Sequence, residues 1–158
     1  MNLRIGYGID VHRLAPSIPL FVGGVEIESE LGAVGHSDAD VLLHAICDAL
    51  LGAANLRDIG YHFSDTDPKF KGIDSKILLT EVIKLIEAKG YHVVNVDCTI
   101  VLEKPKMNPH IPKMQSVIAQ ILKVDVDAVS LKATTHEKVD SFGKSEAIKA
   151  YAACLLNK

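Results

Sequence analysis

The sequence predicts a single α/β (α+β) domain over residues 1–158, in which a mixed β-sheet is packed by about three helices. Three observations support this fold class. Apolar residues alternate with polar residues or glycine near the N-terminus, three later segments repeat apolar residues at helical spacing, and the two kinds of segment are interleaved. With 158 residues, 48% of them hydrophobic and 23% charged, the chain is long enough to bury one core.

The first fifty residues are expected to form a strand, a hairpin and a helix. Alternating apolar side chains predict a strand over residues 3–12. Two short apolar segments flank Gly23-Gly24, a pair that favours a two-residue hairpin turn. A helical repeat of apolar residues then predicts a helix over residues 38–51, with Ser37 as its N-cap and Asp40 in its first turn.

The rest of the chain alternates between helices and strands. A polar loop over residues 55–74 is followed by a predicted helix over 75–89, a strand over 92–102, a helix over 112–122 and a strand over 129–133. Residues 146–156 are ambiguous, because their alanines favour a helix while their apolar residues alternate as in a strand.

Charge and composition exclude several classes of protein. The net charge is −3 and no long run of Lys or Arg is present, so nucleic acid is not an expected partner. The longest apolar runs, residues 49–54 and 151–156, are far shorter than the roughly 20 residues of a membrane span. The three cysteines are odd in number and widely spaced, which indicates core residues in a reducing compartment rather than a disulfide scaffold.

The strongest candidate site combines Asp10, His12 and His44. Asp10 and His12 lie two positions apart on a predicted strand, so their side chains leave the same face about 7 Å apart at Cα. His44 lies on the first predicted helix, four residues from both Asp40 and Asp48. A carboxylate at that spacing is the partner that a metal-bound histidine usually has on its second ring nitrogen.

Two histidines and one carboxylate leave a fourth coordination position free, as in a catalytic zinc site. Non-haem iron uses the same ligand set, and spacing does not separate the two metals. Gly6 and Gly8 precede Asp10 on the same face and are expected to leave room for a ligand near the backbone. On spacing alone a structural interpretation is equally open, with Asp10 at a strand end, His12 exposed and His44 hydrogen-bonded in the core.

Two polar motifs combine a structural with a phosphate-binding interpretation. The run from His36 to Asp40 is a helix cap, and His36 at a helix N-terminus is also placed to donate a hydrogen bond to a phosphate. Thr134 and Glu137 match a capping box at a helix start. Alternatively, Thr134 and Thr135 surround a polyphosphate while Glu137 holds a hard cation such as Mg²⁺.

A third motif is the proline-rich run of residues 104–109. It is either a stiff connector or a loop whose main-chain groups read a planar base.

Taken together, these motifs resemble the 2-C-methyl-D-erythritol 2,4-cyclodiphosphate synthases from end to end. The resemblance rests on Gly8-Ile9-Asp10-Val11-His12, Gly23-Gly24-Val25, His36-Ser37-Asp38-Ala39-Asp40-Val41, Leu43-His44-Ala45, Asp48-Ala49-Leu50-Leu51-Gly52, Asp58-Ile59-Gly60, residues 63–68, Asn95-Val96-Asp97, Pro105-Lys106-Met107, Pro109-His110-Ile111-Pro112 and Lys132-Ala133-Thr134-Thr135.

This resemblance implies a homotrimer with active sites between subunits, and a cytidine diphosphate substrate that is cyclised with release of CMP. Asp10, His12 and His44 would bind Zn²⁺, and Glu137 would help to hold Mg²⁺ or Mn²⁺ on the diphosphate. His36 and Thr135 would stabilise the charge that develops at the β-phosphorus. The remaining substrate-binding positions carried over are Ser37, Asp58, Ile59, Gly60, Phe63, Ser64, Asp65, Thr66, Asp67, Pro105, Lys106, Met107, Asn108, Thr134 and Lys144.

The chain departs from the family pattern after Glu137. The usual Gly-Phe pair and arginine are replaced by a run in which Phe142 is displaced by one position and Lys144 stands for the arginine. His136 also replaces a more usual threonine. In the family these positions line a central trimer cavity that takes an isoprenoid diphosphate, so we expect weaker or no binding of that ligand here, because lysine lacks the two-pronged fork of arginine.

Two other functions compete with cyclisation. One is a zinc-dependent phosphohydrolase that activates water at the open metal position. The other is a trimeric nucleotide- or isoprenoid-binding protein with a structural metal. The expected location is a bacterial cytoplasm, with a processed plastid form as the alternative.

Overall fold

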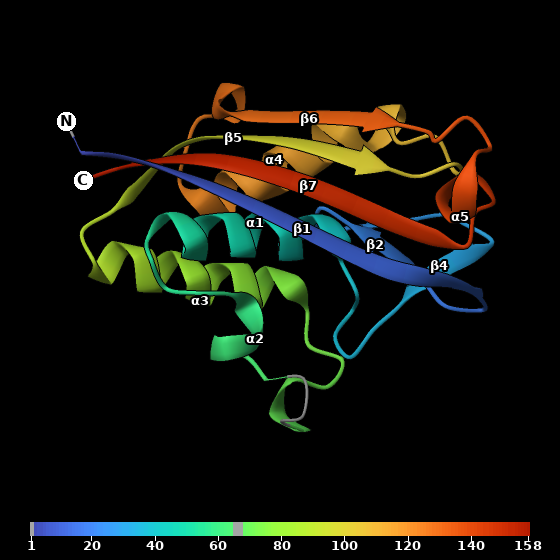
Figure 1. Cartoon of the computed structure of the whole chain (residues 1–158), viewed down its shortest axis with the longest axis horizontal. Coiled ribbons are helices and arrows are strands. Elements are labelled where there is room, and N and C mark those ends of the chain that lie inside the picture. Colours follow the sequence, from blue (N-terminus) through green and yellow to red (C-terminus); the bar gives the residue numbers. More distant parts are fainter. Residues whose placement is uncertain (1, 65–67) are drawn as a thin grey trace.

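The computed structural model describes residues 2–64 and 68–158, which form a five-stranded sheet with helices packed on one face (Figure 1). The strands lie in the order β4-β1-β7-β5-β6, with β5 and β6 parallel and the other pairs antiparallel. Their bounds are β1 (Leu3–Pro16), β4 (Leu31–Val34), β5 (His92–Val101), β6 (Val129–Thr134) and β7 (Ala147–Asn157). The predicted mixed sheet and α+β class are therefore confirmed.

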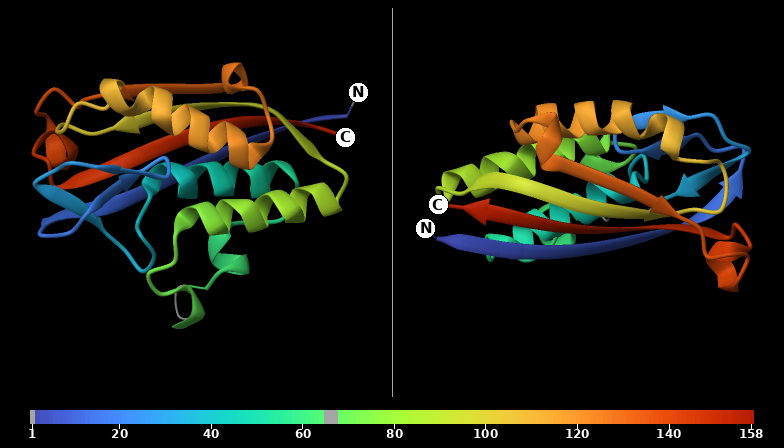
Figure 2. Two further views of the ribbon diagram at one scale, coloured as in Figure 1. Left: turned by 180° about the vertical axis from the view of Figure 1, so that it is seen from behind. Right: turned by 90° about the horizontal axis from the view of Figure 1, so that it is seen from above.

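Three longer helices pack on the sheet, as predicted, and all three lie on the same face (Figure 2). They are α1 (Val41–Ala53), α3 (Ser75–Ala88) and α4 (Ile111–Leu122). A separate hairpin pairs β2 (Leu20–Val22) with β3 (Val25–Ile27) around Gly23 and Gly24, whose φ angles of 61° and 75° need glycine. Short helical turns make up α2 (Ile59–His62), α5 (Asp140–Gly143) and the 3₁₀ segments Pro68–Phe70, Asn108–His110 and Val126–Ala128.

Helix α1 is the centre of the core and packs directly on β1 and β7. Gly6 and Gly8 make this contact possible, since a Cβ atom at either position would lie 1.8 Å or 2.0 Å from the carbonyl oxygens of Ala49 and Ala45. The expectation that these glycines leave room for a ligand is therefore wrong. The helix backbone fills the space, and the glycines set how closely His44 approaches β1.

The N-terminus of α1 also differs from the prediction. The helix begins at Val41 and its N-cap is Asp40, not Ser37. The buried Asp40 carboxylate accepts hydrogen bonds from the backbone N–H groups of Leu42 and Leu43, and from Gly23 and Gly24 at 2.9 Å and 2.6 Å. These tertiary donors select Asp40 over Ser37, and they tie the β2–β3 turn to the helix.

The ambiguous tail is a strand. Residues of β7 alternate between buried and half-buried positions, and β7 lies between β1 and β5 in the sheet. Pairing along both of its edges outweighs the helix propensity of its alanines. Strand β5 has one irregularity, a register shift at Val94 that turns this side chain out to solvent, while Val96, Cys98 and Ile100 farther along the strand are buried.

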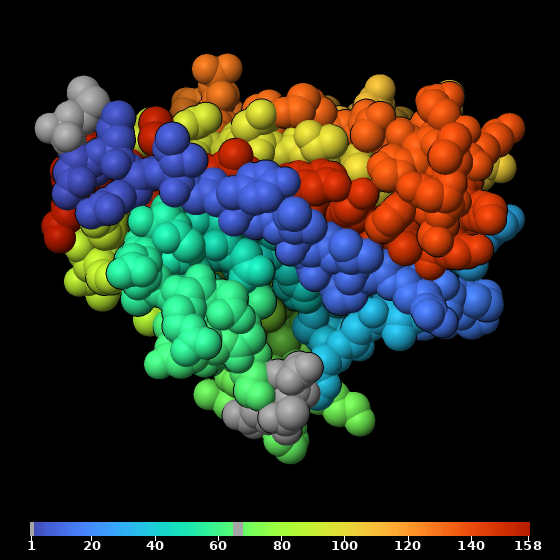
Figure 3. All heavy atoms as spheres, viewed as in Figure 1, coloured from blue at the N-terminus to red at the C-terminus, as the bar shows by residue number. Residues whose placement is uncertain are grey.

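The face of the sheet opposite the helices is open and partly apolar. On β1 the side chains of Ile5, Tyr7, Ile9 and Val11 point outward, and Ile5 is 81% exposed. Figure 3 shows β1 crossing this face beside β7. Among the described residues, no helix is both long enough and apolar enough to cross a membrane. Each of the three cysteines is buried with its thiol free, as predicted for core residues.

Candidate metal centre and substrate cleft

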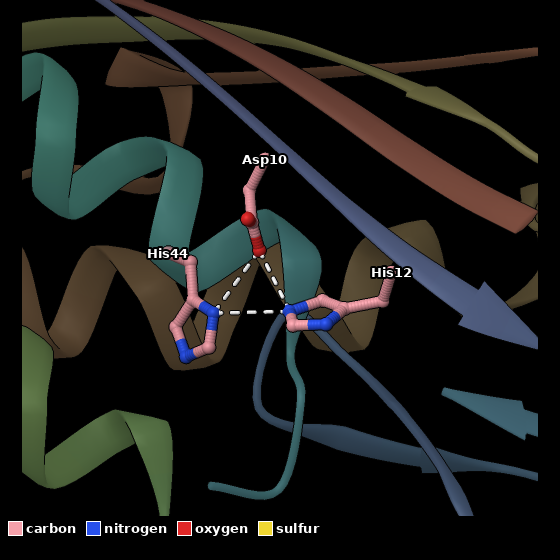
Figure 4. Close-up of side chains that lie close together, drawn as sticks. All are labelled: Asp10, His12 and His44. Carbon is pink, nitrogen blue, oxygen red and sulfur yellow. Dashed lines mark hydrogen bonds and ion pairs between the residues drawn. The ribbon is translucent and has the colours of Figure 1, made fainter. Parts of the chain in front are cut away.

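Three side chains from β1 and α1 converge on one point, as the sequence predicts. The Oδ2 atom of Asp10 lies 2.8 Å from Nε2 of His12 and 3.0 Å from Nδ1 of His44, and the two ring nitrogens are 3.3 Å apart (Figure 4). All three residues are half-buried. They are the one group of three His, Cys, Asp or Glu side chains within the described part of the chain whose ligand atoms lie close enough together to hold a metal ion.

The outer hydrogen bonds of both histidines decide which nitrogens face the centre as lone pairs. Nδ1 of His12 lies 3.0 Å from the carbonyl oxygen of Val34, which can only accept, so Nδ1 carries the proton and Nε2 is free to act as a ligand. Nε2 of His44 lies against two hydroxyl groups, from Ser37 at 3.1 Å and from Ser75 at 2.9 Å. With a proton on that nitrogen, Nδ1 of His44 also faces the centre as a lone pair.

Two lone pairs and a carboxylate oxygen at these distances repel one another unless a cation lies between them. The donor set of two imidazole nitrogens and one carboxylate therefore fits a divalent metal ion with an open coordination position. In the metal-free protein, burial acts to raise the pKa of Asp10, but hydrogen bonds that it accepts from protonated imidazole rings of His12 and His44 outweigh this, so the pKa lies well below its usual range. The carboxyl group is accordingly a ready ligand.

The carboxylates of Asp40 and Asp48, one of which was expected to contact His44, form other hydrogen bonds. Asp40 caps α1, and Asp48 accepts a 2.7 Å hydrogen bond from the backbone N–H of Ile59. The prediction that one of them contacts the second ring nitrogen of His44 is therefore wrong. Hydroxyl groups occupy that position instead, and the Asp38 carboxylate lies behind the Ser75 hydroxyl.

A cleft of about 350 Å³ opens beside the metal ligands. Five of the predicted substrate-binding residues outside the triad line it together with His12 and His44, while Phe70, Ile73 and Leu78 add apolar surface. These five are His36, Ser37, Ile59, Gly60 and Phe63. Phe63 packs edge-on against Phe70 with ring centroids 5.5 Å apart, which gives the cleft an apolar floor.

Two further predicted substrate-binding residues, Asp58 and Ser64, are sequence neighbours of residues that line the cleft. Asp58 is exposed at the start of α2, and Ser64 is half-buried at the end of the described loop. Asp65, Thr66 and Asp67 lie outside the described residues. His36 precedes α1 by several residues, and the Asp40 carboxylate already caps the helix, so the expected phosphate position at the helix N-terminus is not available.

The other predicted substrate residues lie elsewhere on the protomer. Pro105 and Lys106 line a second cleft of about 910 Å³ with Glu28, Glu30 and Glu103, and this cleft shares no lining residue with the first. Met107 is only 3% exposed, so its side chain anchors the loop in the core. Asn108 is exposed.

Strand β6 ends in an exposed polar turn rather than in a helix. Thr134 is its last residue, the hydroxyl of Thr135 donates a 2.8 Å hydrogen bond to Glu137, and Glu137 has a φ of 52°. The helix start suggested by the capping-box match is therefore wrong. Glu103 fixes this turn by accepting hydrogen bonds from the backbone N–H groups of His136 and Lys138. Lys144 is exposed at the C-terminal end of α5.

The fold and site define a class of protein: a mixed-sheet α+β chain with a His₂-carboxylate metal centre at a cleft. The YgbB family profile matches residues 3–157. A 2-C-methyl-D-erythritol 2,4-cyclodiphosphate synthase from Porphyromonas gingivalis is 60% identical over 153 residues, covering 97% of this chain and 94% of the relative. The chain belongs to the YgbB family.

Solved structures agree with this assignment. A structure of 2C-methyl-D-erythritol-2,4-cyclodiphosphate synthase has a TM-score of 0.91 and 38% identity, covering 98% of this chain and all of the other. A CDP-bound form of such a synthase has a TM-score of 0.90 and 37% identity over 98% of this chain and all of the other.

Proposed function

We propose that this chain, over residues 1–158, is a single-domain 2-C-methyl-D-erythritol 2,4-cyclodiphosphate synthase, a phosphorus–oxygen lyase of non-mevalonate isoprenoid biosynthesis. Its substrate is 4-diphosphocytidyl-2-C-methyl-D-erythritol 2-phosphate, and its products are the cyclic diphosphate and CMP. The observation that carries the proposal is the convergence of Asp10, His12 and His44 beside a cleft lined by the predicted methylerythritol-binding residues. The relative that is 60% identical over nearly the whole chain has this name.

The reaction requires positioning more than proton transfer. The attacking group is the 2-phosphate of the substrate itself, which is already ionised, so no general base is needed. The chain must hold this oxygen in line with the β-phosphorus while CMP leaves, and such positioning supplies roughly 7–11 kcal/mol. His36 and Thr135 stabilise the charge that develops at the β-phosphorus. Asp58, Gly60 and the loop over residues 63–67 orient the methylerythritol.

The metal assignments follow from the ligand types. Zn²⁺ is held by Asp10, His12 and His44, whose two imidazoles and one carboxylate suit it. Glu137 holds Mg²⁺ or Mn²⁺, since a carboxylate oxygen is the ligand that hard cations prefer. When bound, the two cations supply Lewis-acid neutralisation of the phosphate oxygens, which allows two anionic groups to approach each other.

A complete site needs a second subunit. The cleft at the metal centre and the cleft at Pro105 and Lys106 share no lining residue, although the substrate has to contact both groups of residues. We place the cytidine diphosphate part against residues 105–108 and Thr134 of one subunit and the methylerythritol against the metal centre of the next. The exposed apolar side chains of β1 supply the contact surface for the homotrimer. The bacterial origin of the relatives supports a bacterial cytoplasm as its location.

The test is an anaerobic ³¹P NMR time course with the diphosphocytidyl substrate, Zn²⁺ and Mg²⁺. We expect a cyclic diphosphate and equimolar CMP from the wild-type protein. His44→Ala should abolish product formation, while His92→Ala, which changes an exposed histidine at the start of β5, should not. Open-chain phosphates carrying solvent oxygen would contradict the proposal in favour of a phosphohydrolase. Intact substrate with folded, zinc-loaded protein would favour a binding protein.

A further inference from the structure

The outer nitrogen of His44 is held by a hydroxyl group from a helix far along the chain. Nε2 of His44 lies 2.9 Å from Oγ of Ser75, the first residue of α3, and 3.1 Å from Oγ of Ser37. Ser75 is fully buried, and it is one of only two buried polar residues in the described core, the other being the helix cap Asp40. A fully buried hydroxyl beside a metal ligand needs a functional or structural reason.

Hydrogen-bond polarity fixes the direction of this contact. The Ser75 hydroxyl donates its single proton to Oδ1 of Asp38 in a short hydrogen bond, so toward His44 it offers only a lone pair. Ser37 Oγ accepts from the backbone N–H of Ala39 at 3.1 Å and has a second lone pair that can accept from His44. When a metal ion takes the place of the Nδ1 proton that otherwise bonds to Asp10, His44 carries its proton on Nε2, and Nδ1 faces Asp10 and His12 as a lone pair.

The same residues hold two chain segments together. Asp38 accepts a second hydrogen bond, of 3.0 Å, from the backbone N–H of Ser75. Its own N–H donates to the carbonyl of Ile73 at 3.1 Å, and the N–H of Gly72 donates to the carbonyl of His36 at 2.7 Å. The segment that contains His36 is thus attached to the end of the loop that lines the cleft, and the Ser75–Asp38 pair lies at the junction.

We propose that Ser75 and Asp38 are positioning residues that hold His44 in the metal-binding tautomer. They do so through two consecutive hydrogen bonds: His44 donates from Nε2–H to Ser75 Oγ, and the Ser75 hydroxyl donates to the Asp38 carboxylate. The pair does not touch the metal ion or the reacting phosphates. It orients the imidazole ring and excludes the tautomer in which Nδ1 is protonated and cannot bind a metal. The proposal rests on the metal centre of the proposed function, but not on the identity of the substrate.

Zinc affinity measured without any substrate tests the proposal. Removal of a partner that orients a metal-bound histidine typically weakens metal binding by 10- to 100-fold. We expect that loss for Ser75→Ala and for Asp38→Ala, measured by competition with a chromophoric chelator. Because Ser75 and Asp38 act through one series of hydrogen bonds, the effects of their replacement should not add. The double variant should bind zinc no more than about threefold more weakly than the single variant with the lower zinc affinity. The matched control is Ser116→Ala, which removes an exposed hydroxyl that bonds to the Pro112 carbonyl on α4.

A second readout separates positioning from a loss of packing. In zinc-loaded wild-type protein, the Nε2 proton of His44 should exchange slowly with solvent in ¹H–¹⁵N spectra, and Ser75→Ala should accelerate that exchange. If Ser75→Ala does not fold, Asp38→Asn keeps the side-chain shape and should still weaken zinc binding by about fivefold or more. Zinc affinity within about twofold of the wild-type value, with an unchanged exchange rate, would overturn the proposal. Unchanged zinc affinity in His44→Ala would instead show that the metal centre itself is misassigned.

Discussion

The carboxylate of Asp48 accepts a 2.7 Å hydrogen bond from the backbone N–H of Ile59, the first residue of α2. Asp48 lies one turn after His44 on α1, so the same helix presents a metal ligand and fixes the beginning of the segment that lines the cleft. This contact links α1 to the Asp58–Gly60 segment through a side chain, and it helps to set the distance between the metal centre and the proposed methylerythritol site.

Replacement of Asp48 should therefore weaken substrate binding without loss of the metal. A hydrogen bond to a charged group contributes about 1.5–3 kcal/mol, so Asp48→Ala should raise KM roughly 10- to 100-fold, while zinc content stays at the wild-type value. Asp48→Asn keeps an acceptor and should recover most of the effect. Steady-state kinetics and metal analysis of the three proteins check this expectation, and an unchanged KM in Asp48→Ala would contradict it.

The pH dependence of KM gives an independent test of the same contact. Burial raises the pKa of the Asp48 carboxyl above its usual value, and the Ile59 hydrogen bond opposes this only in part. As the pH falls through that raised pKa, the protonated carboxyl becomes a weaker acceptor and KM should rise. In Asp48→Asn this rise should be absent from the KM profile. Identical profiles for the two proteins would exclude Asp48 as the titrating group.

Asp40 should be a determinant of stability rather than of activity. Its buried carboxylate accepts hydrogen bonds from four backbone N–H groups, two at the start of α1 and two in the Gly23-Gly24 turn. Asp40→Ala leaves these donors without their partner, and we expect a loss of about 3–5 kcal/mol in the free energy of unfolding. Urea unfolding at one fixed protomer concentration measures it.

The control for this experiment is Asp125→Ala. Asp125 also accepts a backbone hydrogen bond, from Asp127 at 2.9 Å, but in an exposed turn where water replaces it. Its loss should cost about 1 kcal/mol or less. Equal losses in the free energy of unfolding for the two variants would show that the buried donors around Asp40 do not account for its contribution to stability.

The exposed apolar side chains of β1 predict the behaviour of the assembly. Ile5 is 81% exposed on the face opposite the helices, and in the proposed homotrimer it is buried between subunits. Ile5→Glu should convert the trimer to monomers in light scattering and should reduce activity, because each site needs two subunits. Ile77→Glu, at a position 52% exposed on α3 and therefore on the helix side of the sheet, should leave the mass unchanged. A wild-type protein that is monomeric at micromolar concentration would refute the trimer directly.

The sequence was sufficient to predict the three longer helices and most strands of the sheet, because these depend on local periodicity; the metal ligands were predicted from periodicity together with the family resemblance. The alternation along β1 places Asp10 and His12 on one face, and the helical repeat of α1 brings His44 to the same side. The motifs quoted for the family resemblance then identified the cleft residues. These signals need no knowledge of contacts between distant segments.

What the sequence did not predict depends on tertiary contacts. Ser37 and Asp40 are both good caps, and only the donors from Gly23 and Gly24 select Asp40. The partner of the second His44 nitrogen is Ser75, 31 positions away, and no spacing rule connects the two. Val94 is exposed because the pairing of β5 with β7 shifts register there, an irregularity that alternation alone does not reveal.

The departure from the family pattern after Glu137 gives a final prediction about a ligand other than the substrate. Lys144 is exposed at the end of α5, and the neighbouring Phe142 ring already contacts His136 and the Lys149 ammonium group, whose Nζ lies 4.2 Å from the ring centre. A lysine provides charge without the planar fork that grips a diphosphate in two places.

Calorimetric titration of the wild-type protein with geranyl diphosphate should therefore show weak or no binding, and Lys144→Arg should tighten it by about tenfold. Lys144→Met removes the charge and should abolish any residual binding. Tight binding of one geranyl diphosphate per trimer to the wild-type protein would show that lysine serves as well as arginine at this position.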